Sequence, residues 1–168
     1  LDALIKEIKE SKSLVKKLRS VYIGGGTPVA LSSNDLIRVL KAIDYNGVEY
    51  TVEAGRPDCI TEENLKILKD FGVNRICVNP QTFSDKTLIN IGRNHTAKDI
   101  FEKFNLAKKY GFDINMDFIA GLPEEDFSDF KNSIDTAINL SPENITVHTL
   151  CLKKGSLLKE ETDRLDGG

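Results

Sequence analysis

Short apolar segments rich in β-branched residues alternate with amphipathic segments along most of the chain, at about 25–30 residues for each pair. This rhythm predicts consecutive β–α units, whose strands lie parallel in one sheet. Five strands are expected, at 21–25, 48–55, 74–80, 112–123 and 144–152, and the fourth runs into a Gly-Leu-Pro turn at 121–123. A closed eight-stranded barrel needs about 250 residues, and the chain has 168. The sequence therefore predicts one domain that is either an open sheet or part of a barrel.

Helices are expected between these strands, at 3–18, 32–43, 61–72, 84–92, 96–111 and 126–140. The segment at 32–43 opens with Ser and Asn residues suited to an N-cap, and the segment at 61–72 stops at Gly72, a usual C-terminal residue of helices. Pro80 is expected to end the third strand, because proline cannot donate a hydrogen bond to the sheet.

The charge balance excludes several classes of partner. The 23 Lys and Arg residues are mixed with 26 Asp and Glu residues, for a net charge of −3, so no attraction to nucleic acid or to an anionic membrane is expected. No apolar run approaches the roughly 20 residues that cross a bilayer, and the N-terminal segment is amphipathic, unlike a signal peptide. Cys59, Cys77 and Cys151 are too scattered for a disulfide framework. A soluble cytoplasmic protein is predicted.

Ligands bind at the C-terminal ends of parallel strands, because the connecting loops gather there. Polar residues and glycines occupy each of these positions in the chain. They are Gly24, Gly25, Gly26 and Thr27 after the first strand, Glu53 in the second, Asn79 and Gln81 in or after the third, Asp117 and Gly121 in or after the fourth, and His148 and Thr149 in the fifth.

Glu53 and Asp117 stand out because each lies inside an apolar strand, where a carboxylate is costly to bury unless it is paired or binds something. Their position at one end of the sheet predicts that they converge on one pocket. The alternative for each acid is a structural hydrogen-bond acceptor or a rim residue. Likewise Gln81 is compatible with a turn residue, and Arg93 with a cation at the C-terminal end of the preceding helix.

The glycine run in "VYIGGGTPVALSS" first suggests a phosphate loop. No Gly-Lys-Ser/Thr follows it, as a Walker A loop requires, and the third glycine of a G-x-G-x-x-G fingerprint would fall on Val29. Pro28 removes a backbone N–H where an anion would need a donor. The run is therefore expected to offer carbonyl groups and close backbone approach, which together with Glu53 suit an ammonium group.

The segments "YIGGGTP", "VEAGRP", "NPQTF…IGRNHT", "NMDFIAGLP" and "ITVHTL" resemble, in this order, the radical S-adenosylmethionine enzymes. More narrowly they resemble the oxygen-independent coproporphyrinogen III oxidase subfamily and its coproporphyrinogen dehydrogenase-like branch. The resemblance covers residues from about 20 to 152, most of the chain. It implies an α/β fold that is a partial (β/α)6 TIM-type barrel, with about five of its parallel strands present here.

The resemblance also implies roles for residues of this chain. The glycine run, Gly24, Gly25, Gly26 and Thr27, would contact the methionine end of S-adenosylmethionine, and Glu53 would hold the polar groups of that cofactor. Gln81, Arg93 and Asp117 would bind a second S-adenosylmethionine, and Cys151 would contact cofactor through its backbone. No catalytic residue is assigned.

The chain departs from the family pattern in one respect. The C-x-x-x-C-x-x-C motif that binds three irons of a [4Fe–4S] cluster is absent, and in the family it follows the first strand, upstream of the segment where this sequence begins. Residues 1–168 are therefore expected to be a single fragment of the core domain, without the strand and loop that carry the cluster and without a C-terminal domain. Cys59, Cys77 and Cys151 are expected to be core or loop residues and not cluster ligands.

The implied activity is the oxidative decarboxylation of coproporphyrinogen III propionates to vinyl groups by a 5′-deoxyadenosyl radical, in haem biosynthesis. A tetrapyrrole substrate and a one-electron donor such as flavodoxin or ferredoxin would be its partners, and the fragment alone is expected to be inactive. One alternative is a haem carrier related to the oxidase, with His148 as a candidate axial ligand. Another is a radical S-adenosylmethionine reaction on a different substrate.

Overall fold

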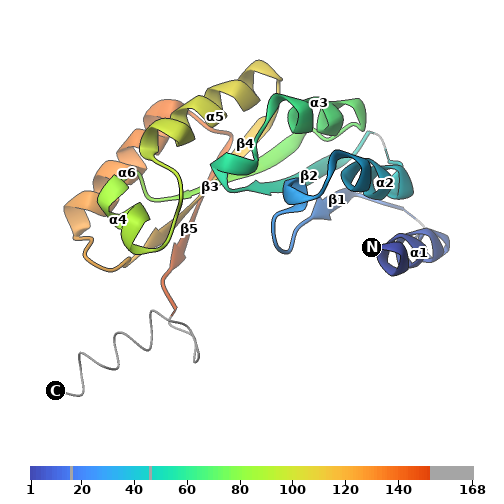
Figure 1. Ribbon diagram of the computed structural model, residues 1–168, viewed down its shortest axis with the longest axis horizontal. Coiled ribbons are helices and arrows are strands. Elements are labelled where there is room, and N and C mark those ends of the chain that lie inside the picture. The colour runs from blue at the N-terminus through green and yellow to red at the C-terminus, as the bar shows by residue number, and fades with distance from the viewer. Residues whose placement is uncertain (16, 46, 152–168) are drawn as a thin grey trace.

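The computed structural model describes residues 1–15, 17–45 and 47–151. In these residues five strands form one sheet in the order β1-β2-β3-β4-β5, and every neighbouring pair is parallel. The sheet curls into an arch with the helices along its outer side (Figure 1). This arrangement confirms the predicted α/β partial barrel. Its strands are β1 (Ser20–Ile23), β2 (Glu49–Gly55), β3 (Arg75–Gln81), β4 (Asp113–Ala120) and β5 (Asn144–Thr149).

The helices occupy the segments between the strands. The α-helices are α1 (Asp2–Ser11), α2 (Ser33–Ile43), α3 (Glu62–Asp70), α4 (Asp85–Asn90), α5 (Ala97–Lys109) and α6 (Phe127–Leu140), and the short 3-10 turns are η1 (Lys12–Leu14), η2 (Pro28–Ala30) and η3 (Pro57–Cys59). Ser32 caps α2 by accepting a hydrogen bond from the Asp35 backbone N–H, and Gly72 follows α3 with a φ of 80°. The predicted ends of these two helices are thus confirmed.

The core lies between the outer face of the sheet and the helices. Alternate residues of the central strands are almost fully buried there, since side chains of a strand point to opposite faces in turn. These residues are Tyr50, Val52, Ile76, Val78, Ile114, Met116 and Phe118. The other set of alternating residues is left on the concave face, and it is polar.

Two predicted boundaries were wrong. The first helix was expected at 3–18, but α1 ends at Ser11 and a 3-10 turn follows, because Val15 adopts an extended conformation. Pro80 does not end the third strand: β3 runs on to Gln81, and the register with β4 shifts between Val78 and Gln81, so the proline lies where the regular ladder is interrupted. The fourth strand ends at Ala120, directly before the predicted Gly-Leu-Pro turn, so that boundary is confirmed.

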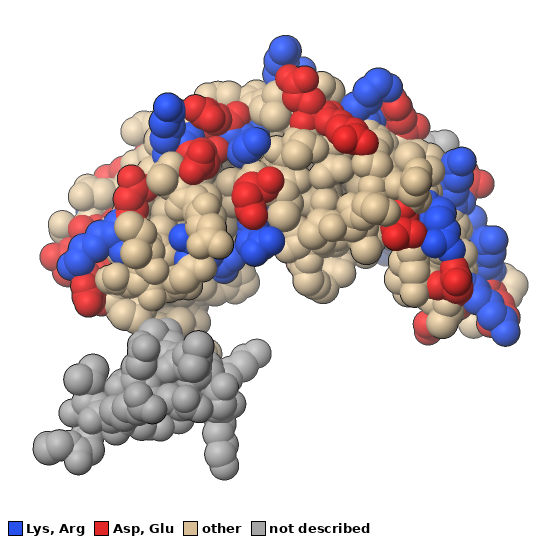
Figure 2. All heavy atoms as spheres, viewed as in Figure 1, with Lys and Arg blue, Asp and Glu red and all other residues tan. Residues whose placement is uncertain are grey.

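The last strand ends at Thr149, and the expected end at 152 lies outside the described residues. Over the described residues, none of the helices has both the length and the apolar character needed to cross a membrane. Basic and acidic side chains are intermixed over the helical face seen in Figure 2.

Candidate functional site

The concave face of the sheet forms a polar hollow of about 480 Å³. Every strand contributes to it, because each presents its second set of alternating residues to this side. The hollow is lined by Tyr22 from β1, Glu49, Thr51 and Glu53 from β2, Arg75 and Cys77 from β3, Asn115 and Asp117 from β4, and Asn144, Thr146 and His148 from β5. Such a concentration of hydrogen-bonding groups on the inner face of a half-barrel is typical of a ligand site.

Tyr22, Glu53 and Cys77 form one end of a network across this face. The Tyr22 hydroxyl donates to Oε1 of Glu53 at 2.6 Å and lies 3.9 Å from the sulfur of Cys77. Burial and then the hydrogen bond to Glu53 raise the pKa of Tyr22 far above its ordinary value, so the hydroxyl stays a donor. Burial likewise raises the pKa of the Cys77 thiol.

Asn115 connects the remaining strands. Its amide nitrogen donates to Oδ1 of Asp117 at 2.6 Å and lies 3.8 Å from the Cys77 sulfur. Its carbonyl oxygen accepts from Thr146 at 3.1 Å and from the amide of Asn144. A continuous set of polar contacts therefore runs from Tyr22 on β1 to Asn144 and Thr146 on β5, and it fixes the orientation of Glu53 and of Asp117.

The glycine run leaves β1 beside Glu53, and each of its three glycines has a different local environment. A Cβ atom at Gly24 would lie 2.7 Å from the Tyr22 ring and 3.1 Å from the carboxyl group of Glu53, so no side chain fits. Gly25 has a φ of 104°, which favours glycine. At Gly26 the φ angle lies outside the left-handed region, and a Cβ atom would meet no described atom within 4 Å. The fold of the described residues therefore requires glycine at 24 and 25 but not at 26.

Thr27 ties this loop to the end of the next strand. A Cβ atom at Gly55 would lie 3.3 Å from the Thr27 side chain, and Gly55 itself has a φ of 66°. The loop after β1 and the end of β2 thus pack directly against each other. This packing keeps the glycine run close to Glu53.

The structure brings together some of the predicted site residues and not others. Glu53, Asp117 and His148 line one hollow, as the convergence of strand ends predicted. Gln81 lies outside it, with only 8% of its surface exposed, at a φ of 70°. Arg93 lines a separate cleft beyond the end of α4, and Cys151 is exposed after β5.

Tyr22, Cys77, Asn115 and Thr146 line the hollow but were not predicted as members of the site. The period of two within each strand was the available signal: Cys77 lies two residues before Asn79, and Asn115 two residues before Asp117, both on the inner face. Asn79 has a buried side-chain oxygen with no hydrogen-bond partner in the described part of the chain. Asn79 itself is not among the residues that line the hollow.

The described residues include no group of three or more His, Cys, Asp or Glu side chains that could hold a metal ion. Cys59, Cys77 and Cys151 are free thiols in different parts of the fold. A [4Fe–4S] cluster therefore has no ligand set among residues 1–15, 17–45 and 47–151.

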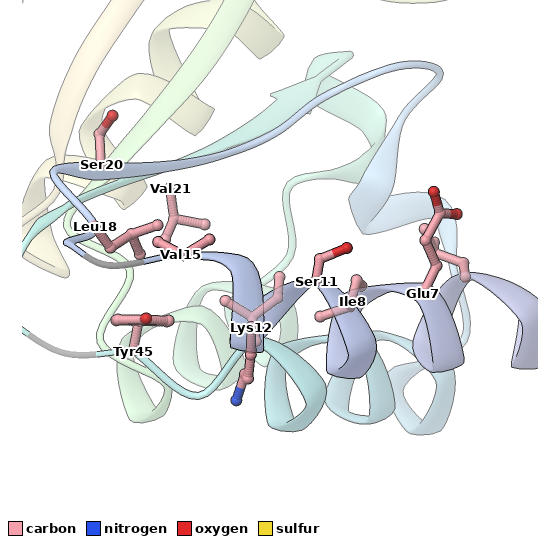
Figure 3. Close-up of a pocket in the computed structure, with 11 residues that line it drawn as sticks. Glu7, Ile8, Ser11, Lys12, Val15, Leu18, Ser20, Val21 and Tyr45 are labelled. Carbon is pink, nitrogen blue, oxygen red and sulfur yellow. The ribbon is translucent and has the colours of Figure 1, made fainter.

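A second hollow of about 410 Å³ lies between α1 and the edge strand β1 (Figure 3). Its lining is mainly apolar, with Leu4, Ile8, Val15, Leu18 and Val21 among the residues that contribute. Glu7 is its one acidic residue, whereas the concave face carries Glu49, Glu53 and Asp117. The concave face, and not this groove, is the candidate site.

A parallel α/β half-barrel whose concave face is polar, with a glycine run and a carboxylate at the ends of its first two strands, belongs to the class of cofactor-binding TIM-type domains. The family model of the Radical SAM superfamily matches residues 1–137. The chain belongs to the radical S-adenosylmethionine superfamily.

The chain is similar in sequence to two named proteins of this superfamily. The chain is 41% identical over 147 residues to the oxygen-independent coproporphyrinogen-III oxidase-like protein HemZ of Bacillus subtilis, covering 83% of this chain and 29% of that protein. It is 39% identical over 143 residues to the heme chaperone HemW of the same organism, covering 81% of this chain and 38% of HemW. The chain thus spans well under half the length of either relative.

Solved structures confirm the fold. The structure of the coproporphyrinogen III oxidase HemN from Escherichia coli, a radical SAM enzyme, superimposes with a TM-score of 0.81 at 24% identity, over 99% of this chain and 44% of HemN. The archaeal Elp3 of Methanocaldococcus infernus gives a TM-score of 0.77 at 18% identity over 96% of this chain and 44% of that one. The chain therefore shares the fold of HemN, which agrees with the partial barrel that the sequence motifs implied.

Proposed function

We propose that the hollow binds S-adenosylmethionine, with the methionine end of the cofactor between the glycine run and Glu53. The observation that carries this proposal is the closeness of Glu53 to the glycine run, where the space for a Cβ atom at Gly24 is occupied by the Tyr22 ring and the Glu53 carboxyl group. An ammonium group needs only acceptors, and this corner supplies a carboxylate next to a bent backbone. Gly26, which the fold does not itself require to be glycine, is where we place the closest approach of the ligand.

Asp117 faces the same hollow from β4 and is held by Asn115. We assign it to a second S-adenosylmethionine. The assignment of Gln81, Arg93 and Cys151 to cofactor binding rests on the family resemblance alone, since none of the three lines this hollow.

In the proposed activity, the protein that carries this chain removes carboxyl groups from coproporphyrinogen III propionates and leaves vinyl groups. Bound together with a [4Fe–4S] cluster, S-adenosylmethionine would supply hydrogen-atom abstraction with one electron from a donor such as flavodoxin or ferredoxin, and the loss of carbon dioxide would release one electron from the substrate to an acceptor. The residues of this chain contribute positioning: they orient the cofactor and line the space beside it. The open inner side of the half-barrel suits a flat tetrapyrrole.

Isothermal titration of the chain with S-adenosylmethionine tests the cofactor proposal. Gly26→Ala is the sharpest variant, because its backbone is ordinary and its new methyl group meets no described atom. We expect a fall in affinity of about tenfold or more with an unchanged melting temperature. Equal affinities of the wild type and the variant would contradict the placement of the cofactor at this glycine.

The activity is tested on a protein that carries this chain together with a C-x-x-x-C-x-x-C segment, under dithionite. Mass spectrometry is expected to show loss of carbon dioxide from coproporphyrinogen III and formation of 5′-deoxyadenosine. Formation of 5′-deoxyadenosine without any decarboxylated product would favour another substrate.

One observation favours a second function, that of a haem carrier. His148 lies on β5 at the wall of the hollow, with its side chain exposed, and imidazole is a usual axial ligand of haem. The relatives named heme chaperone, which include proteins of Bacillus subtilis and Lactococcus lactis, support the same function. Haem titration followed by the Soret band, with wild type and His148→Ala, tests it. Identical titrations would remove His148 as the ligand.

A further inference from the structure

Gln81 ends β3 in a backbone conformation that residues other than glycine rarely adopt. Its φ is 70°, inside the left-handed region, where a side chain strains the backbone. The sheet around it is irregular, because Pro80 has no N–H to donate and the register between β3 and β4 shifts between Val78 and Gln81. A regular ladder therefore does not impose this conformation, and contacts outside the ladder have to hold it.

The residue after Gln81 is the centre of a buried hydrogen-bond network. Thr82 has only 1% of its surface exposed. Its hydroxyl donates to Oε1 of Glu125, in the loop that follows β4, and accepts from the backbone N–H of Ser84 at 3.0 Å. The chain directly after the strained position is thus bonded to the loop of the neighbouring strand.

Ser133 on α6 completes this network, which we call the Thr82 network (Thr82, Glu125 and Ser133). Its oxygen accepts from the Phe83 N–H at 3.0 Å and lies 3.2 Å from the Thr82 oxygen. A carboxylate can only accept, so the single proton of the Thr82 hydroxyl belongs to the bond with Glu125. Ser133 is therefore the donor to Thr82, and every hydrogen-bonding position of the Thr82 hydroxyl is filled. A buried network that is fully paired in this way is rigid.

The loop that supplies Glu125 is fixed on both sides. Its backbone N–H bonds to the carbonyl of Leu122, which is 4% exposed, at 3.2 Å. Asp126, the next residue, caps α6 in a capping box. Glu124, on the other side, forms an ion pair with Lys86 of α4 at 2.9 Å. The Glu125 carboxyl group is therefore a fixed point for Thr82.

Gln81 keeps the polar end of its side chain available, although only 8% of its surface is exposed. Its amide makes no hydrogen bond with the described residues, and neither of its two polar atoms is fully buried. An amide offers two donors and one acceptor oxygen. It lies at the C-terminal end of β3, the end of a parallel strand where ligands bind.

We propose that Thr82, Glu125 and Ser133 are positioning residues, which hold Gln81 in its left-handed conformation and so fix the place from which its amide binds a ligand. The network acts on the three residues that follow Gln81, where the sheet no longer controls the backbone. That the ligand is S-adenosylmethionine rests on the proposed function. The positioning of Gln81 does not, and it is tested first.

Two variants of Thr82 separate the hydroxyl from the shape of the side chain. Thr82→Val removes the hydroxyl and keeps the shape, and Thr82→Ser keeps the hydroxyl. The readout is the nuclear Overhauser effect between the amide and α protons of Gln81, which is stronger at positive φ because the two protons are closer. We expect a weaker effect in Thr82→Val and the wild-type effect in Thr82→Ser. A Thr82→Val protein that melts at a lower temperature but keeps the wild-type effect would overturn the proposal, because the network would then serve the fold alone.

A second pair of variants changes the network from its more exposed end and does not depend on the folding of Thr82→Val. Glu125→Ala is expected to weaken the Overhauser effect of Gln81. Glu124→Ala, which changes the adjacent acid and its ion pair with Lys86, is expected to leave it unchanged. Equal effects of these two variants would also contradict the positioning role.

Titration calorimetry of the same proteins with S-adenosylmethionine tests the link to the cofactor. Thr82→Val is expected to raise the Kd by about threefold to tenfold, and Thr82→Ser to keep the wild-type value. A weaker Overhauser effect with an unchanged Kd would support the positioning of Gln81 and contradict its assignment to the cofactor. Failure of the proposed function is therefore distinguished from failure of this inference.

Discussion

The Tyr22 hydroxyl bonds to Glu53 across the junction of β1 and β2, with 2.6 Å between the two oxygens. The two residues are diagonal neighbours, since the register pairs Tyr22 with Thr51. The same tyrosine ring closes the space beside Gly24. Tyr22 therefore sets the position of the Glu53 carboxylate and the path of the glycine run at the same time.

Removing the hydroxyl of Tyr22 tests this relationship. Tyr22→Phe is expected to raise the Kd for S-adenosylmethionine by about threefold to tenfold, because one hydrogen bond no longer holds Glu53 toward the ligand. Isothermal titration calorimetry measures this change in Kd. Tyr50→Phe is the matched control, because the Tyr50 hydroxyl is buried without any hydrogen-bond partner in the described residues. A similar change in Kd for both variants would show that Tyr22 has no specific role.

Neutralising Glu53 tests the acid itself. Glu53→Gln is expected to raise the Kd for S-adenosylmethionine by about tenfold to a hundredfold, since hydrogen bonds to a charged group are the stronger kind. Glu49→Gln, on the same strand and facing the same hollow, lies nearer the start of the strand and is expected to leave the Kd unchanged. If Glu49→Gln weakens binding as much as Glu53→Gln, the ligand is not at the C-terminal end of β2.

The parallel sheet and the two acids of the hollow followed from the sequence, because β–α alternation and strand-end positions have direct physical consequences. Glu53 and Asp117 were predicted to converge, and they do. Tyr22 and Asn115 were not predicted, because their roles depend on contacts with other strands that no local pattern encodes. Pro80 was misjudged for a related reason: proline is excluded from a regular ladder, but β3 has a register shift where it lies.

The end of the first helix could not be predicted from the local sequence either. The apolar residues of 3–18 keep a roughly helical spacing, yet none of the residues of α1 is buried. Propensity and amphipathicity decide where a helix stops only when packing supports them. Here the chain leaves the helix at Ser11 and enters β1 after an extended residue at Val15.

Asn115 is expected to be the most important polar residue for the stability of the inner face. Asn115→Ala removes contacts to Asp117 and Thr146 at once and is expected to lower the free energy of unfolding by about 1–3 kcal/mol, because the partners lose their hydrogen bonds. Urea denaturation measures the change. Asn132→Ala, at an exposed position of α6, is the control and is expected to change stability by at most about 0.5 kcal/mol. Equal effects of the two variants would mean that the network contributes nothing.

The Cys77 thiol reports on the charge of Asp117. Burial raises the pKa of Cys77, the negative charge of Asp117 raises it further, and the hydrogen bonds with Tyr22 and Asn115 lower it. Asp117→Asn removes one of the raising contributions, so the pKa of the thiol falls and the thiolate forms at lower pH. Alkylation of Cys77 by iodoacetamide is therefore expected to begin at lower pH and to be severalfold faster at pH 8 in this variant.

Peptide mass spectrometry separates the reaction of Cys77 from that of exposed Cys151, which serves as the internal standard. Asp113→Asn is the matched control, on the same strand but absent from the groups that shift the Cys77 pKa. Because the folded-state pKa lies above that of the unfolded thiol, the unfolded chain ionises first as the pH rises, and the wild type is expected to lose stability above the ordinary pKa of a thiol. A pH profile of Cys77 alkylation that is unchanged in Asp117→Asn would show that the charge of Asp117 does not affect the pKa of the Cys77 thiol.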